Sequence, residues 1–296
     1  MLGASENKSY LILAQNEDEL RATGGFISGV GLLRVHEGRI LEVSFQDSYA
    51  IRSQSEAEPP ETLEKYMGAQ VWLLRDANWS PDFPTTAKVA MEIYERDQGG
   101  SLDGAIAVDQ QAMRLLLEAL GPVEVEGWEQ PVTGENFISV IREAWAPSEG
   151  EDPGQWWSHR KDFMGAIAGA LAQKPETNPG SISPLKLARA IQQALEEKHI
   201  LLYAEDPLAA EILAENHWDG ALLPAEGDYL MVVDTNVGFN KVNPNVEETV
   251  DYQVSIQEDG TVRSDLTLSY HNRSTRRVSQ CIQEARYDAT YEGMMD

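Results

Sequence analysis

Residues 103–125 read DGAIAVDQQAMRLLLEALGPVEV, and this stretch contains a strand signal followed directly by a helix signal. The short apolar run Ala105–Val108 is typical of a buried strand. Asp109 is suited to cap a helix, and the apolar residues after it recur at helical spacing up to Leu120. Gly121-Pro122 then ends the helix. A strand that passes almost at once into a helix favours the α/β class.

The same alternation continues on both sides of this stretch. Towards the N-terminus we predict strands at Tyr10–Ala14, Gly31–His36, Ile40–Gln46 and Val71–Leu74, with helices at Pro59–Met67 and Thr85–Arg96. Towards the C-terminus we predict strands at Val123–Val125, Ile200–Tyr203 and Tyr229–Asp234, and helices at Thr133–Trp145, at Trp156–Gln173, from Ser183-Pro184, and from Asp206-Pro207 to about Asn216. We therefore expect an α/β fold with a mixed central sheet flanked by helices, in which parallel and antiparallel pairings coexist.

The pattern changes near the C-terminus. Apolar and polar residues alternate over residues 250–256, a turn follows at Glu258–Gly260, and alternation resumes from Val262 to Tyr270. This pattern predicts an antiparallel hairpin. We therefore divide the chain into an α/β domain, residues 1–245, and a C-terminal β-hairpin extension, residues 246–296.

Composition limits the classes of function. The chain has 296 residues, of which 42% are hydrophobic, so a sizeable core can form. Its formal net charge of -26 repels nucleic acid, which we exclude as a partner. The single cysteine, Cys281, excludes an intrachain disulfide and a cysteine-rich metal site. The five histidines show no ligand spacing, so zinc is not expected.

The first candidate site follows the strand at Tyr10–Ala14. Glu19, Arg21 and Thr23 precede two glycines there, and glycines let the backbone approach a ligand. The guanidinium of Arg21 offers a planar fork for phosphate or carboxylate. The structural alternative is that Arg21 forms an ion pair with Glu19 or Asp18.

The second candidate site is the segment from Arg75 to Pro84, after the predicted strand Val71–Leu74. Sites in α/β folds commonly lie at the carboxyl ends of strands. Arg75 is suited to hold a phosphate, Asp76 or Asp82 to bind Mg²⁺ or act as a base, and Asn78 to contact a substrate. Alternatively, Asp82 caps the next helix and Arg75 pairs with Asp76.

The third candidate is the adjacent pair Arg160 and Lys161, near Trp156 and Trp157, which is notable in so acidic a chain. These cations are suited to complete an anion pocket. The alternative is a solvated helix start.

Several of these segments resemble a known family. Leu11–Asn16 with Glu19–Ile27, the segment Arg75–Pro84, Asp103–Asp109 with Leu120–Val125, and Asn236–Lys241 resemble four motifs of the bacterial family catalogued as domain of unknown function 4012. This resemblance implies an extracytoplasmic protein with an N-terminal membrane anchor, and further strands after Tyr291. We therefore expect the chain to be a fragment whose natural membrane attachment is such an anchor.

A weaker resemblance extends to the LytR–CpsA–Psr phosphotransferases, which transfer a glycopolymer from a polyprenyl-pyrophosphate lipid to the cell wall. The pair Arg75-Asp76, the basic pair Arg160-Lys161 and, more loosely, Arg21 resemble that family's motifs. The resemblance implies Mg²⁺ as the one cofactor, held by Asp76 with Asp82 or Glu19. The family's Ser-Asp-Thr motif near the first strand is not recognisable here.

The resulting prediction is an extracytoplasmic, phosphotransferase-like domain that binds a polyprenyl-pyrophosphate-linked glycopolymer during cell-envelope assembly. Arg21, Arg75 and Asp76 are its catalytic candidates. Glu19, Thr23, Asn78, Arg160 and Lys161 are its substrate-binding candidates. Two alternatives remain: a non-catalytic module that binds a glycan or polyanion, with tryptophans stacking on sugar rings, and a scaffold whose arginines are satisfied internally.

Overall fold

The computed structural model describes residues 6–146, 152, 155–156, 162–177, 180, 182–238 and 240–275. Its strands are β1 (Lys8–Asn16), β2 (Phe26–His36), β3 (Arg39–Asp47), β4 (Gly104–Val108), β5 (Ile200–Ala204), β6 (Val246–Ile256) and β7 (Val262–Asn272). Its helices are α1 (Glu61–Met67), α2 (Phe83–Gln98), α3 (Gln110–Leu120), α4 (Phe137–Trp145), α6 (Asp162–Thr177), α7 (Pro184–Glu196) and α8 (Pro207–Glu215). Short 3₁₀ helices lie at η1 (Ser48–Ala50), η2 (Leu74–Trp79) and η4 (Asn243–Asn245).

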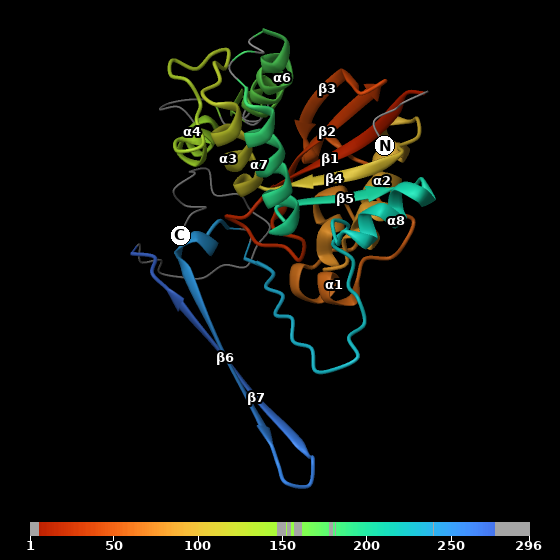
Figure 1. Ribbon diagram of the computed structural model, residues 1–296, viewed down its shortest axis with the longest axis vertical. Coiled ribbons are helices and arrows are strands. Elements are labelled where there is room, and N and C mark those ends of the chain that lie inside the picture. Colours follow the sequence, from red (N-terminus) through yellow and green to blue (C-terminus); the bar gives the residue numbers. More distant parts are fainter. Residues whose placement is uncertain are drawn as a thin grey trace.

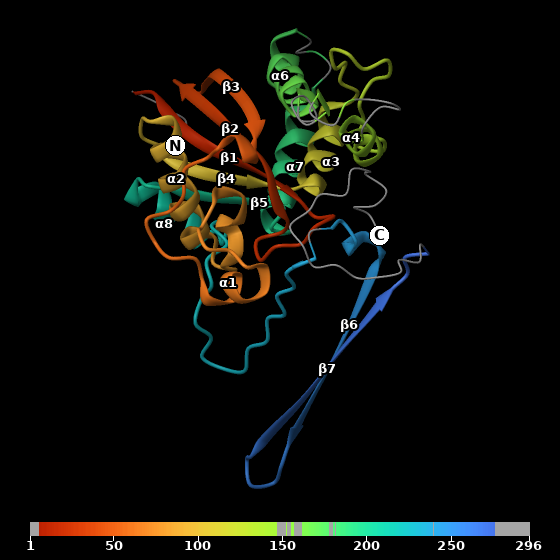
Figure 2. The same ribbon diagram turned by 180° about the vertical axis from the view of Figure 1, so that it is seen from behind.

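Five strands form one mixed sheet in the order β3-β2-β1-β4-β5. β1 pairs parallel with β4, and the other neighbours pair antiparallel. Helices flank the sheet, with α3, α4, α6 and α7 on one side and α1 and α2 on the other (Figures 1 and 2). Helix α8 packs against Leu202 and Ala204 of the edge strand β5. The predicted fold class, a mixed α/β sheet with a separate hairpin, is thereby confirmed.

The period of two along each strand builds two different faces. Leu11 and Leu13 of β1 are fully buried in a core that also contains Phe83 and Ala87 of α2. The alternate residues, Ile12 and Ala14, face a hollow beneath α3, α4 and α6. One face of the sheet is therefore closed by a tightly packed core, whereas the other borders an apolar pocket.

Local capping explains where the helices begin. The Asp109 side chain accepts the backbone N–H of Ala112, which fixes the start of α3 immediately after β4. Ser183 and Asp206 cap α7 and α8 in the same way, each followed by proline at the first helical position. These boundaries agree with those expected from the sequence.

The C-terminal hairpin extends away from the body of the molecule (Figure 1). β6 and β7 pair antiparallel, with Val250 opposite Leu268, and almost all of their residues are exposed. The preceding segment ties the hairpin to the body, because the N–H of Asn236 donates to the carbonyl of Leu20 and the N–H of Asn243 donates to that of Asp18.

Three predicted strands are absent from the residues that the structure describes. In place of Val71–Leu74 there is a single bridge between Leu73 and Gln54, after which the chain enters η2. Val123–Val125 makes only the bridge from Val123 to Val132. Tyr229–Asp234 belongs to neither a strand nor a helix, and Asp234 accepts a hydrogen bond from the hydroxyl of Tyr270. Apolar runs predict burial or extension, whereas a strand also needs a partner with a free edge.

Candidate functional site

Arg21 lies at the centre of a buried charged cluster in the loop after β1. It is 2% exposed. Its guanidinium donates to Glu19 Oε1 at 3.0 Å and to the backbone carbonyls of Leu20 at 3.1 Å and Asn236 at 2.7 Å. Arg21 thus joins its own loop to the segment that leads to the hairpin. This geometry matches the structural alternative raised for the first candidate site.

Asp76 brings the two predicted arginines together. Arg21 Nη2 lies 3.8 Å from Asp76 Oδ1, and Arg75 Nε lies 3.7 Å from Asp76 Oδ2. The Arg75 guanidinium also sits 4.5 Å from the centre of the Tyr49 ring. These residues, together with Glu19, line a cavity of about 260 Å³. The two guanidinium groups, far apart in the chain, therefore share one carboxylate, although Arg75 follows an irregular segment and not the expected strand.

Burial governs the protonation of the two acids in this cluster. Desolvation raises the pKa of Glu19, and the charges of Arg21 and Lys241 oppose that rise. Desolvation also raises the pKa of Asp76, against the charges of Arg21 and Arg75. The acidic and basic side chains of the cluster therefore compensate one another's charges. Arg21 is occupied by internal partners, and Arg75 is the more accessible of the two arginines.

Thr23 and Asn78 support the backbone of the same loop. The Asn78 side-chain amide donates to Thr23 Oγ1 at 3.1 Å and to the carbonyl of Gly25 at 2.7 Å, and both residues are buried. Thr23 Oγ1 also accepts from Gln15 at 2.8 Å. The structure thus brings these predicted substrate-binding residues together as a buried hydrogen-bonded network. Their role in binding a substrate stays a prediction.

Asp82 caps helix α2, as the structural alternative for the second candidate site expected. Its Oδ2 accepts from the backbone N–H and the hydroxyl of Thr85, and its Oδ1 accepts the N–H of Leu222. Asp82 does not line the cavity that Asp76 lines, and its role in holding Mg²⁺ stays a prediction. The other predicted residues, Arg160 and Lys161, lie outside the residues that the structure describes.

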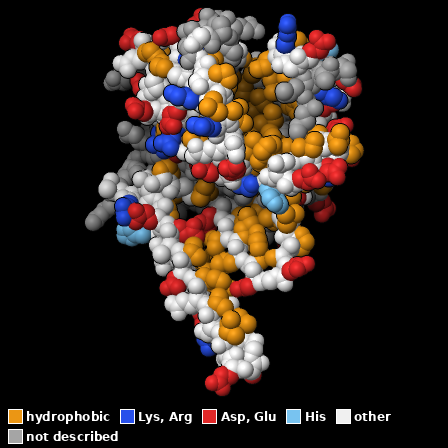
Figure 3. Space-filling model, in the orientation of Figure 1, with side chains coloured by type: hydrophobic (Ala, Val, Ile, Leu, Met, Phe, Trp, Pro, Cys, Tyr) orange, Lys and Arg blue, Asp and Glu red, His pale blue; other side chains and the backbone are white. Residues whose placement is uncertain are grey.

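A large apolar pocket lies between the sheet and the helices that cover it, and it was not predicted from the sequence. Its volume is about 340 Å³. The lining side chains come from seven elements, β1 to β4, α3, α4 and α6, and include Ile12, Val43, Phe45, Met113, Phe137, Ile141, Trp145, Met164, Ile167 and Leu171. Figure 3 shows hydrophobic side chains lining a hollow on this face. Gln15, Asp109 and Gln110 supply most of its few polar groups.

Two cations lie on or against α4, the helix that supplies Trp145 to this pocket. Lys241 Nζ is 5.2 Å from the centre of the Trp145 ring, and Trp145 lines the pocket. On α4, Arg142 donates to both carboxylate oxygens of Asp18, with its Nε 3.0 Å from Oδ2. Lys241 belongs to a motif noted in the sequence, whereas nothing in the sequence pattern singled out Arg142. Arg142 is identified only by its position in the fold, on α4 and next to the loop after β1.

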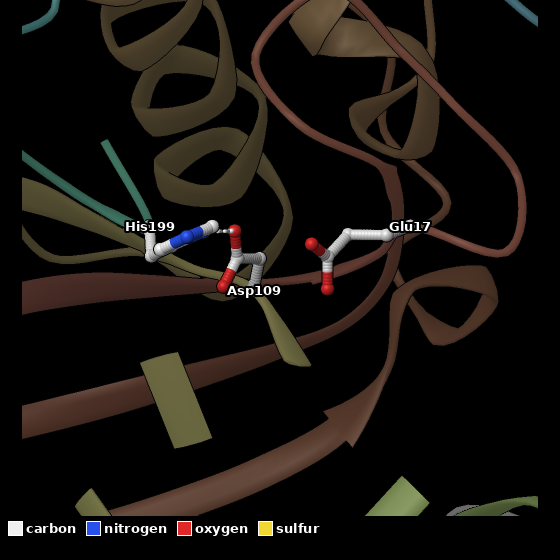
Figure 4. A group of neighbouring side chains, drawn as sticks. All are labelled: Glu17, Asp109 and His199. Carbon is white, nitrogen blue, oxygen red and sulfur yellow. Dashed lines mark hydrogen bonds and ion pairs between the residues drawn. The ribbon is translucent and has the colours of Figure 1, made fainter. Parts of the chain in front are cut away.

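A second group of side chains could hold a metal ion. Glu17, Asp109 and His199 each offer a ligand atom, and these atoms all lie within 4.8 Å of one another (Figure 4). The pKa of Glu17 is raised to about 7, mainly by burial and then by the charge of Asp109. The five histidines show no ligand spacing along the sequence, yet the fold places His199 beside two carboxylates, because spacing does not register residues that meet only in the fold.

Comparison with known families gives one match. Residues 5–145 match the model of a family described as a protein of unknown function, DUF4012. This part of the chain contains the first three motifs noted in the sequence, so the predicted resemblance is confirmed there. No curated protein matches the chain. In the described residues, no helix is both long enough and apolar enough to cross a membrane.

Several solved structures are similar to this chain at low sequence identity. A LytR-Csp2A-Psr enzyme from Actinomyces oris is 12% identical, with a TM-score of 0.45 over 71% of this chain and 75% of that one. Lin1025 from Listeria innocua is 11% identical, with a TM-score of 0.41 over 88% of this chain and 90% of that one. TagV from B. subtilis is 11% identical, with a TM-score of 0.40 over 72% and 80% of the two chains.

Proposed function

We propose that this chain binds a polyprenyl-pyrophosphate-linked glycopolymer outside the cytoplasmic membrane, as a step in cell-envelope assembly. The observation that carries this proposal is the apolar pocket of about 340 Å³ beneath α3, α4 and α6. Leaving so much hydrocarbon surface accessible is unfavourable unless a ligand covers it. A lining this poor in polar groups suits a hydrocarbon chain better than a sugar or a nucleotide.

The cations beside the pocket suit a phosphorylated head group. Lys241 packs against Trp145 of the pocket wall, and Arg142 projects from the same helix as Trp145. In a chain with a net charge of -26, cations on or against the helix that supplies Trp145 to the pocket favour an anionic amphiphile over a neutral one. A diphosphate would compete with the Asp18 carboxylate for the fork of Arg142.

Phosphoryl transfer is a second candidate, supported by the cavity that Arg75 and Asp76 line. An acceptor hydroxyl would attack the glycan-linked phosphorus, forming a new O–P bond and breaking the P–O bond to polyprenyl phosphate, which leaves. The hydroxyl proton would pass to Asp76, whose pKa is raised by burial, and Arg75 would offset charge on the leaving phosphate. No step is assigned to Mg²⁺, because Asp82 does not line the cavity that Asp76 lines.

Binding can be tested with geranylgeranyl pyrophosphate as the probe, by isothermal titration calorimetry. Ala168→Trp would fill the pocket from α6, and we expect it to abolish binding. Gln173→Trp, on the exposed face of α6, is the matched control and should bind like the wild type.

A second comparison distinguishes binding of the hydrocarbon tail from binding of the pyrophosphate head group. Lys241→Met keeps an unbranched side chain against Trp145 but removes the charge. We expect it to weaken pyrophosphate binding about tenfold while leaving binding of geranylgeraniol unchanged. Equal binding of the probe by the wild type and Ala168→Trp would refute the pocket as the tail site.

A further inference from the structure

The topology brings three metal-ligand side chains to one edge of the sheet. Because β1 and β4 are parallel, their carboxyl ends meet at the same edge, with Glu17 just after β1 and Asp109 just after β4. β5 runs antiparallel to β4, so its first residue pairs with Val108 and places His199 at that edge as well. Glu17, Asp109 and His199 therefore meet although 182 residues separate the first from the last along the chain (199 − 17).

The three side chains point toward one another (Figure 4). His199 Nδ1 lies 2.7 Å from Asp109 Oδ2, and the three ligand atoms are all within 4.8 Å of one another. Zinc bonds of about 2.0–2.2 Å to nitrogen and oxygen require ligand atoms roughly 3–4 Å apart. Small side-chain rotations therefore suffice to bring one ion into contact with all three groups.

Main-chain hydrogen bonds hold both carboxylates in place. Glu17 Oε2 accepts the N–H groups of Gln110 at 3.0 Å and Gln111 at 3.2 Å. Asp109 Oδ1 accepts the N–H of Ala112 at 2.8 Å. Fixed outer contacts of this kind orient metal ligands and strengthen binding. The arrangement thus differs from a patch of mobile acids on a surface.

The electrostatics of the site also favour a cation. Burial is the largest cause of the raised pKa of Glu17 and also raises the pKa of Asp109, so the two carboxylates repel and are poorly solvated. His199 opposes the rise in the pKa of Asp109 through its hydrogen bond and its charge, and the rise in the pKa of Glu17 through its charge. A divalent ion would offset both carboxylates at once.

We propose that Glu17, Asp109 and His199 form a binding site for a divalent transition-metal ion, with Zn²⁺ the best fit. One imidazole and two carboxylates are a three-ligand set that leaves a coordination position open to water, as in many zinc sites. The imidazole ligand argues against Mg²⁺, which prefers an all-oxygen shell. The site is distinct from the Asp76 cluster and does not depend on the lipid-binding proposal.

Calorimetric titration of the EDTA-treated, dialysed protein tests this site. We expect one equivalent of Zn²⁺ to bind, and Mg²⁺ to bind far more weakly. His199→Gln and Glu17→Gln should each reduce Zn²⁺ affinity by about tenfold or more. The Gln variant of Glu17 retains an oxygen that can accept from Gln110 and Gln111, so its fold should be preserved. His36→Gln, at the far end of β2, is the matched histidine control and should bind Zn²⁺ like the wild type.

A second measurement covers the case in which a variant folds poorly. Bound Co²⁺ should give visible d–d absorption in the wild type that is altered in Glu17→Gln. The proposal is overturned if the wild type takes up no Zn²⁺, if both variants bind it as tightly as the wild type, or if Mg²⁺ binds equally well. The Ala168→Trp variant should retain Zn²⁺ binding, so failure of lipid binding and failure of metal binding are distinguishable.

Discussion

Replacing Arg21 with methionine should strongly destabilise the protein. The Arg21 side chain is 1% exposed and compensates the buried carboxylates of Glu19 and Asp76. Removing one partner of a buried ion pair costs about 3–5 kcal/mol, because the remaining charge is left without compensation. Arg75→Met is the matched control, because the Arg75 side chain is 29% exposed and lies 3.7 Å from Asp76. We expect it to cost about 0–1 kcal/mol.

The direction in which the stability of the Arg21→Met variant changes with pH follows from the pKa shifts of Glu19 and Asp76. Burial raises the folded-state pKa of Glu19 above 4.5 and that of Asp76 above 3.8, and Arg21 opposes both rises. Without Arg21 both pKa values rise further, so the folded variant binds protons that the unfolded chain does not. Its stability should therefore increase as the pH falls from neutral toward the unfolded pKa values, and its deficit relative to the wild type should shrink.

Urea unfolding, followed by tryptophan fluorescence at neutral pH and at about pH 5, measures both effects. Two results would refute the assignment of Arg21 as a buried structural ion pair. One is an unfolding free energy of Arg21→Met within about 1 kcal/mol of the wild type. The other is a deficit that grows on acidification.

Three further predictions concern local structure, and urea unfolding checks each. Asp82→Ala should cost about 0.5–2 kcal/mol through loss of the α2 cap, whereas Asp82→Asn should cost less. Gly25→Ala should be strongly destabilising, because a Cβ there would lie 2.3 Å from the backbone carbon of Asn16, whereas Gly165→Ala in α6 meets open space and should stabilise by about 0.5–1 kcal/mol. Val254→Thr, at a position 46% exposed on β6, should change stability by less than about 0.5 kcal/mol, and a larger loss would show that this face of the hairpin is covered.

The candidate site was only partly predictable from sequence. The loop after β1 was identified because Glu19, Arg21 and Thr23 concentrate polar chemistry next to an apolar run. The choice between a ligand site and an internal ion pair needed the position of Asp76, 55 residues from Arg21 (76 − 21). The sequence shows that an arginine is able to bind an anion. Only the neighbouring side chains in the fold show whether its guanidinium already pairs with internal carboxylates.

The sequence by itself determined the elements of this protein. Alternating apolar residues, cap residues such as Asp109 and Ser183, and Gly-Pro stops act within a few residues, so β1–β5, most helices and the terminal hairpin are visible without coordinates. Only the tertiary structure decided which elements meet. The group of Glu17, Asp109 and His199 exists because parallel pairing of β1 with β4 and antiparallel pairing of β5 with β4 join distant segments at one edge. The apolar pocket exists because α3, α4 and α6 cover one face of the sheet. Such pairing depends on long-range packing and backbone hydrogen bonds, which no local pattern encodes.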